Sequence, residues 1–198
     1  MRERIRLRGN AVDRLILTLD ASGYPFSWMT WQEAVTHEVA GRVARQLGEF
    51  QFTFTGGLCR RTGQLSKVTI SSIAALRGNN PHAWRKSTIA LTNSALFIRD
   101  RYICAYCGKR GSRHLTRDHI VPLSQGGKDV WRNVTTACMG CNHRKGARTP
   151  EQAKMELFYV PYAPSLQEGL ILENRHILAD QMDMLVGMLP KHSRLTPS

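Results

Sequence analysis

Apolar and polar positions alternate over the first 80 residues in a way that predicts a small α/β unit. Residues 12–19 are mostly apolar and predict a strand. Residues 30–33 place a threonine three positions before a glutamate, which is the capping-box pattern of a helix start, and apolar residues then recur near helical spacing as far as Leu47. The strict alternation over residues 50–54 predicts a half-buried strand.

The remainder of this region has a less uniform pattern. The glycine pair at residues 56–57 predicts a turn, and residues 67–76 fit either a strand or a short helix. Residues 78–81 combine glycine and asparagine with a final proline, which favours a break in the chain. We therefore expect an N-terminal α/β accessory region over residues 1–80.

Two short apolar runs in the middle of the chain predict a β-hairpin. Residues 115–122 and 133–137 are strand-like, and a glycine pair at residues 126–127 lies between them. The polar residues after Cys141 begin a helix. These elements predict a ββα unit, whose domain we place over residues 81–160.

The C-terminal part carries two helix starts. Residues 149–152 have the order threonine, proline, glutamate, glutamine, which suits a capping box with proline in the first turn. Residues 165–168 open a further helix that could continue to Pro190. We expect a C-terminal helical extension over residues 161–198, and hence an α+β fold class for the whole chain.

Composition and charge indicate a globular protein with an acidic partner. The chain has 198 residues, 42% of them hydrophobic, which suits a folded protein. Its formal net charge is +13, and residues 101–150 supply +8 of it with ten Lys and Arg against two Asp. Clustered basic side chains gain free energy by displacing counterions from phosphates, so a nucleic acid is the natural partner.

The apolar runs are too short to predict a membrane protein. None approaches the roughly 20 residues that a membrane helix needs. The stretch 15–19 is bracketed by Asp13 and Asp20 and is too short for the core of a signal peptide. We expect a cytoplasmic, nucleoid-associated protein with no membrane partner.

Four of the five cysteines stand in two C-x2-C pairs, namely Cys104, Cys107, Cys138 and Cys141. In a reducing compartment such pairs are more often metal ligands than disulfides, and two pairs suit one tetrahedral Zn²⁺. Gly108 and Gly140 would supply the backbone freedom for the turns. Four thiolates leave no open coordination position, so the predicted zinc is structural. Disulfides are the alternative, and Cys59 is expected to be a small buried residue.

The order of these motifs resembles the HNH endonucleases, which have a ββα-metal or His-Me finger core. A Cys-x2-Cys pair is followed by Asp-His-Ile-x-Pro at residues 118–122, by Asn133, and by Cys-x2-Cys-Asn-x-x-Lys at residues 138–145. The resemblance covers residues 97–157 and points to the zinc-bearing members, which include phage junction-resolving endonucleases. A looser resemblance, over residues 31–35, is to the N-terminal region of a bacterial group of HNH proteins.

The resemblance implies a role for four residues of the core. His119 would be the general base, and Asp118 and Asn142 would bind Mg²⁺ or Mn²⁺. Asn133 would fix the hairpin and the orientation of His119. Neutral imidazole can deprotonate a water near pH 7, and a hard cation on oxygen ligands neutralises charge on the phosphate and on the leaving 3′ oxygen. The implied products carry 5′-phosphate and 3′-hydroxyl ends.

Further residues could contact nucleic acid or metal. The basic side chains expected to bind neighbouring phosphates are Arg117, Arg144, Lys145 and Arg148. The last metal ligand in this family is often a histidine, whereas here Asn142 occupies the place and His143 follows it. Either residue could therefore be the second ligand of the catalytic ion.

Two other functional classes fit part of the pattern. A zinc-stabilised nucleic-acid-binding module without catalysis would use the same charge and cysteines, and a redox or metal sensor would use the cysteines alone. The set of Asp118, His119 and Asn142 favours the nuclease, because a carboxylate beside phosphates costs affinity unless a cation bridges them. DNA is the expected substrate. One hairpin cuts one strand, so double-strand cleavage would need a homodimer or two encounters.

Overall fold

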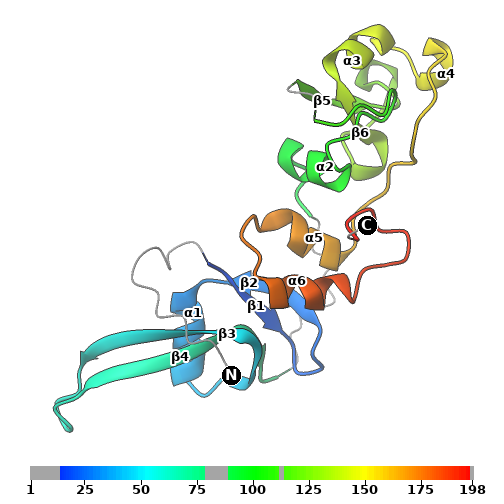
Figure 1. Cartoon of the computed structure of the whole chain (residues 1–198). Coiled ribbons are helices and arrows are strands. Elements are labelled where there is room, and N and C mark those ends of the chain that lie inside the picture. The colour runs from blue at the N-terminus through cyan, green and yellow to red at the C-terminus, as the bar shows by residue number, and fades with distance from the viewer. Residues whose placement is uncertain (1–13, 79–88, 112–113, 197–198) are drawn as a thin grey trace. The chain divides into compact units, whose positions relative to one another are not determined.

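The computed structural model describes residues 14–78, 89–111 and 114–196 of the chain (Figure 1). The chain divides into two compact units, which we call the sheet unit (Met1–Ser87 with Asn174–Met188) and the hairpin unit (Thr88–Glu173 with Leu189–Ser198). The fold is α+β, as predicted, with one sheet in each unit. Within the described ranges, no helix is both long and apolar enough to cross a membrane.

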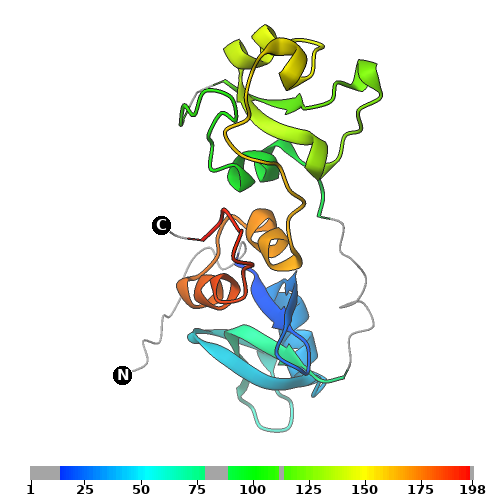
Figure 2. The same ribbon diagram turned by 90° about the vertical axis from the view of Figure 1, so that its right-hand side faces the viewer.

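The sheet unit is built on four strands in the order β2-β1-β4-β3 (Figures 1 and 2). Strand β1 lies parallel to β4 and antiparallel to β2, and β3 is antiparallel to β4. All four residues of β1 are buried, which explains why every one except Thr18 is apolar. The strands are β1 (Ile16–Leu19), β2 (Pro25–Met29), β3 (Val43–Leu58) and β4 (Leu65–Leu76). Residues 12 and 13 of the first predicted strand lie outside the described residues.

Helix α1 (Trp31–Val39) begins at the predicted capping box but ends earlier than predicted. The Thr30 side chain accepts the Glu33 N–H, and the Glu33 carboxylate accepts the Thr30 N–H. The helix stops because Gly41 adopts a left-handed φ of 67°, and the N–H groups of residues 41 and 42 bond back to carbonyls of the last turn. The apolar positions out to Leu47, which predicted more helix, belong to β3 instead.

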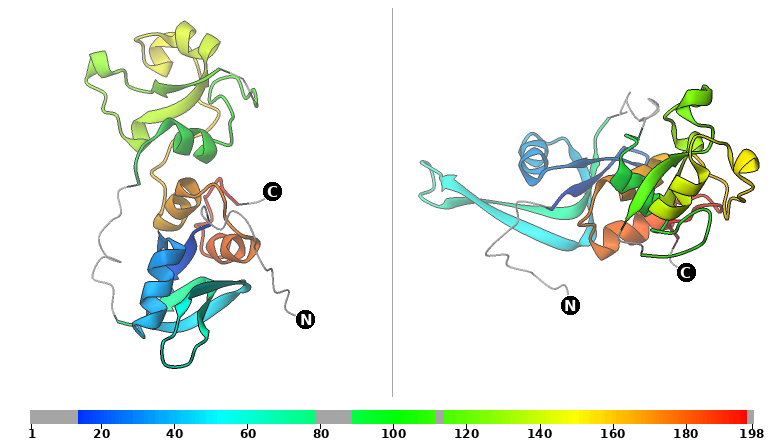
Figure 3. Two further views of the ribbon diagram at one scale, coloured as in Figure 1. Left: turned by 90° about the vertical axis from the view of Figure 1, so that its left-hand side faces the viewer. Right: turned by 90° about the horizontal axis from the view of Figure 1, so that it is seen from above.

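Strands β3 and β4 form a long ribbon, and its turn lies later than predicted. The strand over residues 50–54 is confirmed, and residues 67–76 are resolved as strand. The glycine pair at residues 56–57 continues β3, and the chain reverses at residues 59–64, where Gly63 has a φ of 65°. Figure 3 shows the ribbon extending beyond α1. Cys59 is partly exposed in this turn, so its predicted burial is wrong.

The C-terminal residues form two helices and not one. Helix α5 (Leu166–Glu173) ends at Asn174, whose side chain accepts the His176 N–H and so competes with the helical hydrogen bonds. Helix α6 (Ala179–Val186) follows in the sheet unit, where Gln181 donates to backbone carbonyls. The residues that were expected to form one C-terminal extension are thus divided between the two units.

The hairpin unit contains the predicted ββα arrangement. Strands β5 and β6 pair antiparallel and lie between α2 and α3 (Figures 1 and 2). Helix α4 begins at its predicted capping box. The elements are α2 (Asn93–Arg99), β5 (Leu115–His119), η2 (Leu123–Gln125), η3 (Trp131–Asn133), β6 (Val134–Cys138), α3 (Met139–Lys145) and α4 (Pro150–Ala153).

Helix α2 is fixed to the hairpin by a buried ion pair that the sequence pattern did not indicate. Arg99 and Asp100 are fully buried, and the Arg99 Nε lies 2.9 Å from the Asp100 carboxylate. Arg99 also donates to the Val134 carbonyl at 2.9 Å, and Asp100 accepts the Thr136 N–H at 2.9 Å. Because buried charges need such partners, these bonds hold α2 against β6.

Candidate active site

The four paired cysteines lie together in the hairpin unit. Their sulfur atoms are all within 4.8 Å of one another, and no disulfide joins them. The first pair sits in a turn in which Gly108 has a φ of 69° and donates its N–H to the Cys104 carbonyl. The second pair lies at the start of α3, so Gly140 is helical and its predicted turn is wrong. This tetrad matches the ligand set of a structural zinc ion.

The thiols of the cluster differ in how readily they ionise. Burial opposes ionisation of Cys104, yet backbone N–H groups of Cys138, Cys107 and Tyr106 bring its pKa down to about 7. Burial and the neighbouring sulfurs raise the pKa of Cys141. Four thiolates at this separation repel one another unless a cation neutralises them. A Zn²⁺ ion would supply that charge.

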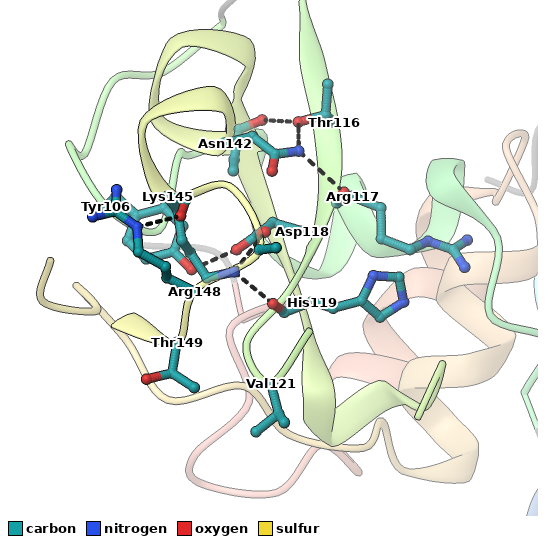
Figure 4. Close-up of polar contacts among 12 residues, drawn as sticks. Tyr106, Thr116, Arg117, Asp118, His119, Val121, Asn142, Lys145, Arg148 and Thr149 are labelled. Carbon is teal, nitrogen blue, oxygen red and sulfur yellow. Dashed lines mark hydrogen bonds and ion pairs between the residues drawn. The ribbon is translucent and has the colours of Figure 1, made fainter. Parts of the chain in front are cut away.

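Strand β5 carries Asp118 and His119, and its alternation places them on opposite faces. The side chains of Thr116 and Asp118 contact side chains of α3. On the opposite face, Arg117 contacts α2 and His119 contacts the loop between the two strands. Figure 4 shows the His119 ring pointing away from the Asp118 carboxylate. Neighbours in the sequence therefore have different surroundings.

Asp118 is buried in a polar cluster beneath α3. It is 4% exposed, and its Oδ1 accepts from Lys145 Nζ at 3.0 Å while its Oδ2 accepts from the Tyr106 hydroxyl at 2.5 Å. Burial, and then the hydrogen bond to Asp118, raises the pKa of Tyr106, so this hydroxyl remains a donor. Lys145 also donates to the His119 carbonyl at 2.7 Å. The Lys145 ammonium thus supplies the positive charge next to Asp118.

Asn142 lies one helical turn before Lys145 on the same face of α3. Its Nδ2 donates to Thr116 Oγ1 at 2.9 Å, which leaves Oδ1 as the atom able to bind a cation. Carboxylate and amide oxygens are ligands that Mg²⁺ accepts, so the chemistry of Asp118 and Asn142 fits a hard cation. In the described arrangement, however, both Asp118 oxygens have hydrogen-bond donors.

His119 is held by a carboxylate on the opposite face. Its side chain is 21% exposed, and Nε2 lies 2.9 Å from Asp129 Oδ1. An ionised carboxylate only accepts hydrogen bonds, so Nε2 carries the proton. In the neutral ring, Nδ1 is then the nitrogen that can accept a proton.

Asp129 is charged because two donors converge on it. Its limited burial works against ionisation, but hydrogen bonds from His119 and Arg117 outweigh this effect and lower its pKa. Arg117 Nη1 lies 2.7 Å and 3.0 Å from the two oxygens of Asp129. Asp129 is therefore an anion near neutral pH.

Asn133 fixes the chain that follows His119. Its Oδ1 accepts the Val121 N–H at 2.9 Å, and its Nδ2 donates to the carbonyls of Val121 and Lys128 at 3.0 Å and 2.8 Å. The side chain thus closes the loop between the two strands. It does not contact the His119 ring directly, so any effect on the ring passes through the backbone.

The basic residues expected to bind phosphates differ in their accessibility. Lys145 is fully buried against Asp118, which removes it from a phosphate-binding surface in this arrangement. Arg117 already donates hydrogen bonds to Asp129, to the first residue of α2 and to a carbonyl just before that helix. Arg144, Arg148 and His143 are exposed.

Sequence reasoning did not identify two residues that contact the predicted site, Asp129 and Tyr106. One signal was available for the first, because Asp118 and Asp129 are the two acidic residues within the strongly basic stretch 101–150. No comparable signal existed for Tyr106, since it lies inside the first cysteine pair and reaches Asp118 only through the fold.

Comparison with known proteins agrees with the geometry. A family model described as HNH endonuclease matches residues 104–158, which span the cysteine cluster, the hairpin and α3. No curated protein matches the chain significantly. An HNH domain supports a nuclease-type function and implies a nucleic-acid substrate. Residues 104–158 therefore form an HNH endonuclease domain with the four-cysteine cluster of the zinc-bearing type.

Proposed function

We propose that this chain is a metal-dependent endonuclease that hydrolyses phosphodiester bonds in DNA. The observation that carries the proposal is the hydrogen bonding of His119 within the HNH match: Nε2–H donates to Asp129, and Nδ1 is left to accept a proton. A general base in this state is competent near neutral pH.

The proposed reaction uses this nitrogen. His119 Nδ1 takes a proton from a water, the water oxygen attacks phosphorus, and the bond from phosphorus to the 3′ oxygen breaks. The 3′ oxygen then takes a proton from solvent. The products are a 5′-phosphate and a 3′-hydroxyl. The side chains of Arg144 and Arg148 are exposed, and we propose that they contact neighbouring phosphates.

Asp118 and Asn142 are the proposed ligands of Mg²⁺ or Mn²⁺, with His143 as the alternative to Asn142. Such an ion, when bound, neutralises charge on the phosphate and on the leaving oxygen. Lys145 and Tyr106 both donate to Asp118, and the Lys145 ammonium repels a cation at this carboxylate, so we expect Lys145 to move away when the ion binds. Asn133 is proposed to keep the loop after His119 in place.

The occupied oxygens of Asp118 also favour a second function. If Lys145 never leaves Asp118, the domain has the zinc cluster and the basic surface of a nucleic-acid-binding module but no place for a catalytic ion at Asp118. This alternative is a zinc-stabilised binding protein without catalysis.

Nicking of supercoiled plasmid by the full-length, zinc-loaded protein distinguishes the two functions. We expect cleavage with Mg²⁺ or Mn²⁺, and a loss of about 10²- to 10⁴-fold in His119→Ala, because proton transfer by a positioned base contributes that much. His176→Ala is the matched control, since it removes an exposed imidazole of the sheet unit. Ligation of the nicks tests for 5′-phosphate and 3′-hydroxyl ends.

DNA binding is measured in the same samples. Equal cleavage by the wild type and His119→Ala would exclude His119 as the base. Binding by both proteins without cleavage by either would establish the binding module in place of the nuclease. An RNA substrate run in parallel tests the choice of DNA, and double-strand breaks that increase with protein concentration would indicate either a homodimer or two separate encounters.

A further inference from the structure

Asp129 lies in the loop between the two strands of the hairpin, outside every motif that identifies the HNH domain. It is ten residues beyond His119 in the chain, yet its Oδ1 lies 2.9 Å from His119 Nε2. The loop returns to the strand because Asn133 bonds to both ends of it, at Val121 and at Lys128. The contact is therefore a product of the loop conformation.

Asp129 is itself held by Arg117. One terminal nitrogen of the guanidinium donates to both carboxylate oxygens, at 2.7 Å and 3.0 Å. The remaining nitrogens are anchored, since Nε donates to Asn93 Oδ1 at 2.9 Å and Nη2 donates to the Leu91 carbonyl at 3.1 Å. A planar guanidinium fixed at three points cannot rotate without losing bonds, so it fixes the carboxylate as well.

This arrangement differs from an ordinary surface ion pair. The Asp129 side chain is 49% exposed, and an isolated pair at that exposure contributes little to stability. Here the same carboxylate is shared by Arg117 and the His119 ring, and Arg117 is only 19% exposed. These contacts therefore restrict the orientation of the His119 ring, whereas an isolated surface ion pair has no such third partner.

We propose that Asp129 is a positioning residue for the base, and that Arg117 and Asn93 hold Asp129 in place. By accepting a hydrogen bond from Nε2–H, Asp129 selects the tautomer in which Nδ1 is unprotonated, and it fixes the direction in which Nδ1 points. This inference rests on the proposed role of His119. It assigns Arg117 to the support of the site and not to phosphate binding.

Two substitutions of Asp129 test the proposal. In Asp129→Ala the ring loses its partner, and we expect kcat to fall by about 10- to 100-fold with little change in KM, since small misplacements of a reacting group have costs of this size. In Asp129→Asn the amide oxygen can still accept a hydrogen bond from Nε2–H, so we expect a smaller decrease in kcat. Lys128→Gln is the matched control, because it changes a charge on the same loop without touching His119.

A second readout does not depend on cleavage. Nitrogen-15 NMR of the His119 ring reports which nitrogen is protonated, and we expect the Nε2–H tautomer in the wild type and a mixture in Asp129→Ala. An unchanged tautomer together with an unchanged kcat in Asp129→Ala would overturn the positioning role. If the wild type does not cleave at all, the proposed nuclease function fails, while the NMR comparison still decides whether Asp129 sets the tautomer.

Discussion

At the scale of the residue, the chemistry available to each polar group of the site depends on its hydrogen-bond partners. Asp118 and His119 are adjacent in sequence, but one is buried against an ammonium and the other bonds to a half-exposed carboxylate. A buried carboxylate without a partner is costly, so Lys145 and Tyr106 determine whether Asp118 is tolerated in its place. The same two donors control access of a cation to it.

Lys145→Met is therefore expected to destabilise the hairpin unit by about 3 to 5 kcal/mol, because the buried Asp118 charge loses its cationic partner. The double variant Asp118→Asn with Lys145→Met should recover part of this loss, since no charge then remains buried. Urea unfolding of the zinc-loaded protein measures both. Lys109→Met, at an exposed position, is the control. A cost below about 1 kcal/mol for Lys145→Met would show that the Tyr106 hydroxyl alone is enough to stabilise the buried Asp118 carboxylate.

At the scale of the element, hydrogen bonds at the ends of helices set their lengths. Two predicted capping boxes are present, at Thr30 and at Thr149. The ends of α1 and α5 were predicted less well, because a left-handed glycine and an asparagine side chain override apolar spacing that would permit a longer helix. Local backbone geometry and side-chain hydrogen bonds therefore determine where these two helices end, and the spacing of apolar residues does not.

Thr30→Ala should destabilise the sheet unit by about 1 kcal/mol at pH 7, as expected for loss of an N-cap. Hydrogen bonds from the Thr30 backbone and side chain lower the pKa of Glu33. The Glu33 contribution is therefore complete above the ordinary pKa of glutamate and is lost as the pH falls through the lowered value. Unfolding of the wild type and Glu33→Gln at several pH values tests this, and a difference that grows towards acid pH would contradict it.

At the scale of the whole molecule, the two units are stabilised in different ways. The sheet unit has an apolar core that includes Ile16, Met29, Phe52 and Ile70. The corresponding cluster around the cysteines in the hairpin unit is small, and two of its four buried members are themselves cysteines. A Zn²⁺ ion held by the cysteines would stabilise this small cluster, because structural zinc contributes on the order of 10 kcal/mol to folding.

Removal of zinc should consequently unfold the hairpin unit and leave the sheet unit folded. Hydrogen exchange of the full-length protein, with and without a zinc chelator, is the measurement. We expect protection to be lost in β5, β6 and α3 and retained in β1 and β4. Cys104→Ser should reproduce the effect, whereas Cys59→Ser, outside the cluster, should not. Loss of protection in both units at once would contradict separate stabilisation.

The sequence by itself determined the features that depend on local pattern. The spacing of the four cysteines, the capping boxes and the two runs on either side of Gly126 and Gly127 were enough to predict the four-cysteine cluster and the ββα unit. Each of these depends on residues close together in the chain or on ligand chemistry that permits few alternatives. The family resemblance added the roles of Asp118, His119, Asn133 and Asn142, which stay predictions.

Only the tertiary structure decided how the polar groups pair. The contacts of Asp118 with Tyr106 and Lys145, and of His119 with Asp129, join side chains from different elements. Such contacts depend on the pleat of β5, on the face that α3 presents and on the loop that Asn133 closes. A pattern of residue types does not specify these orientations. The contact between Asp129 and His119, and the donors that surround Asp118, could therefore be identified only from the tertiary structure.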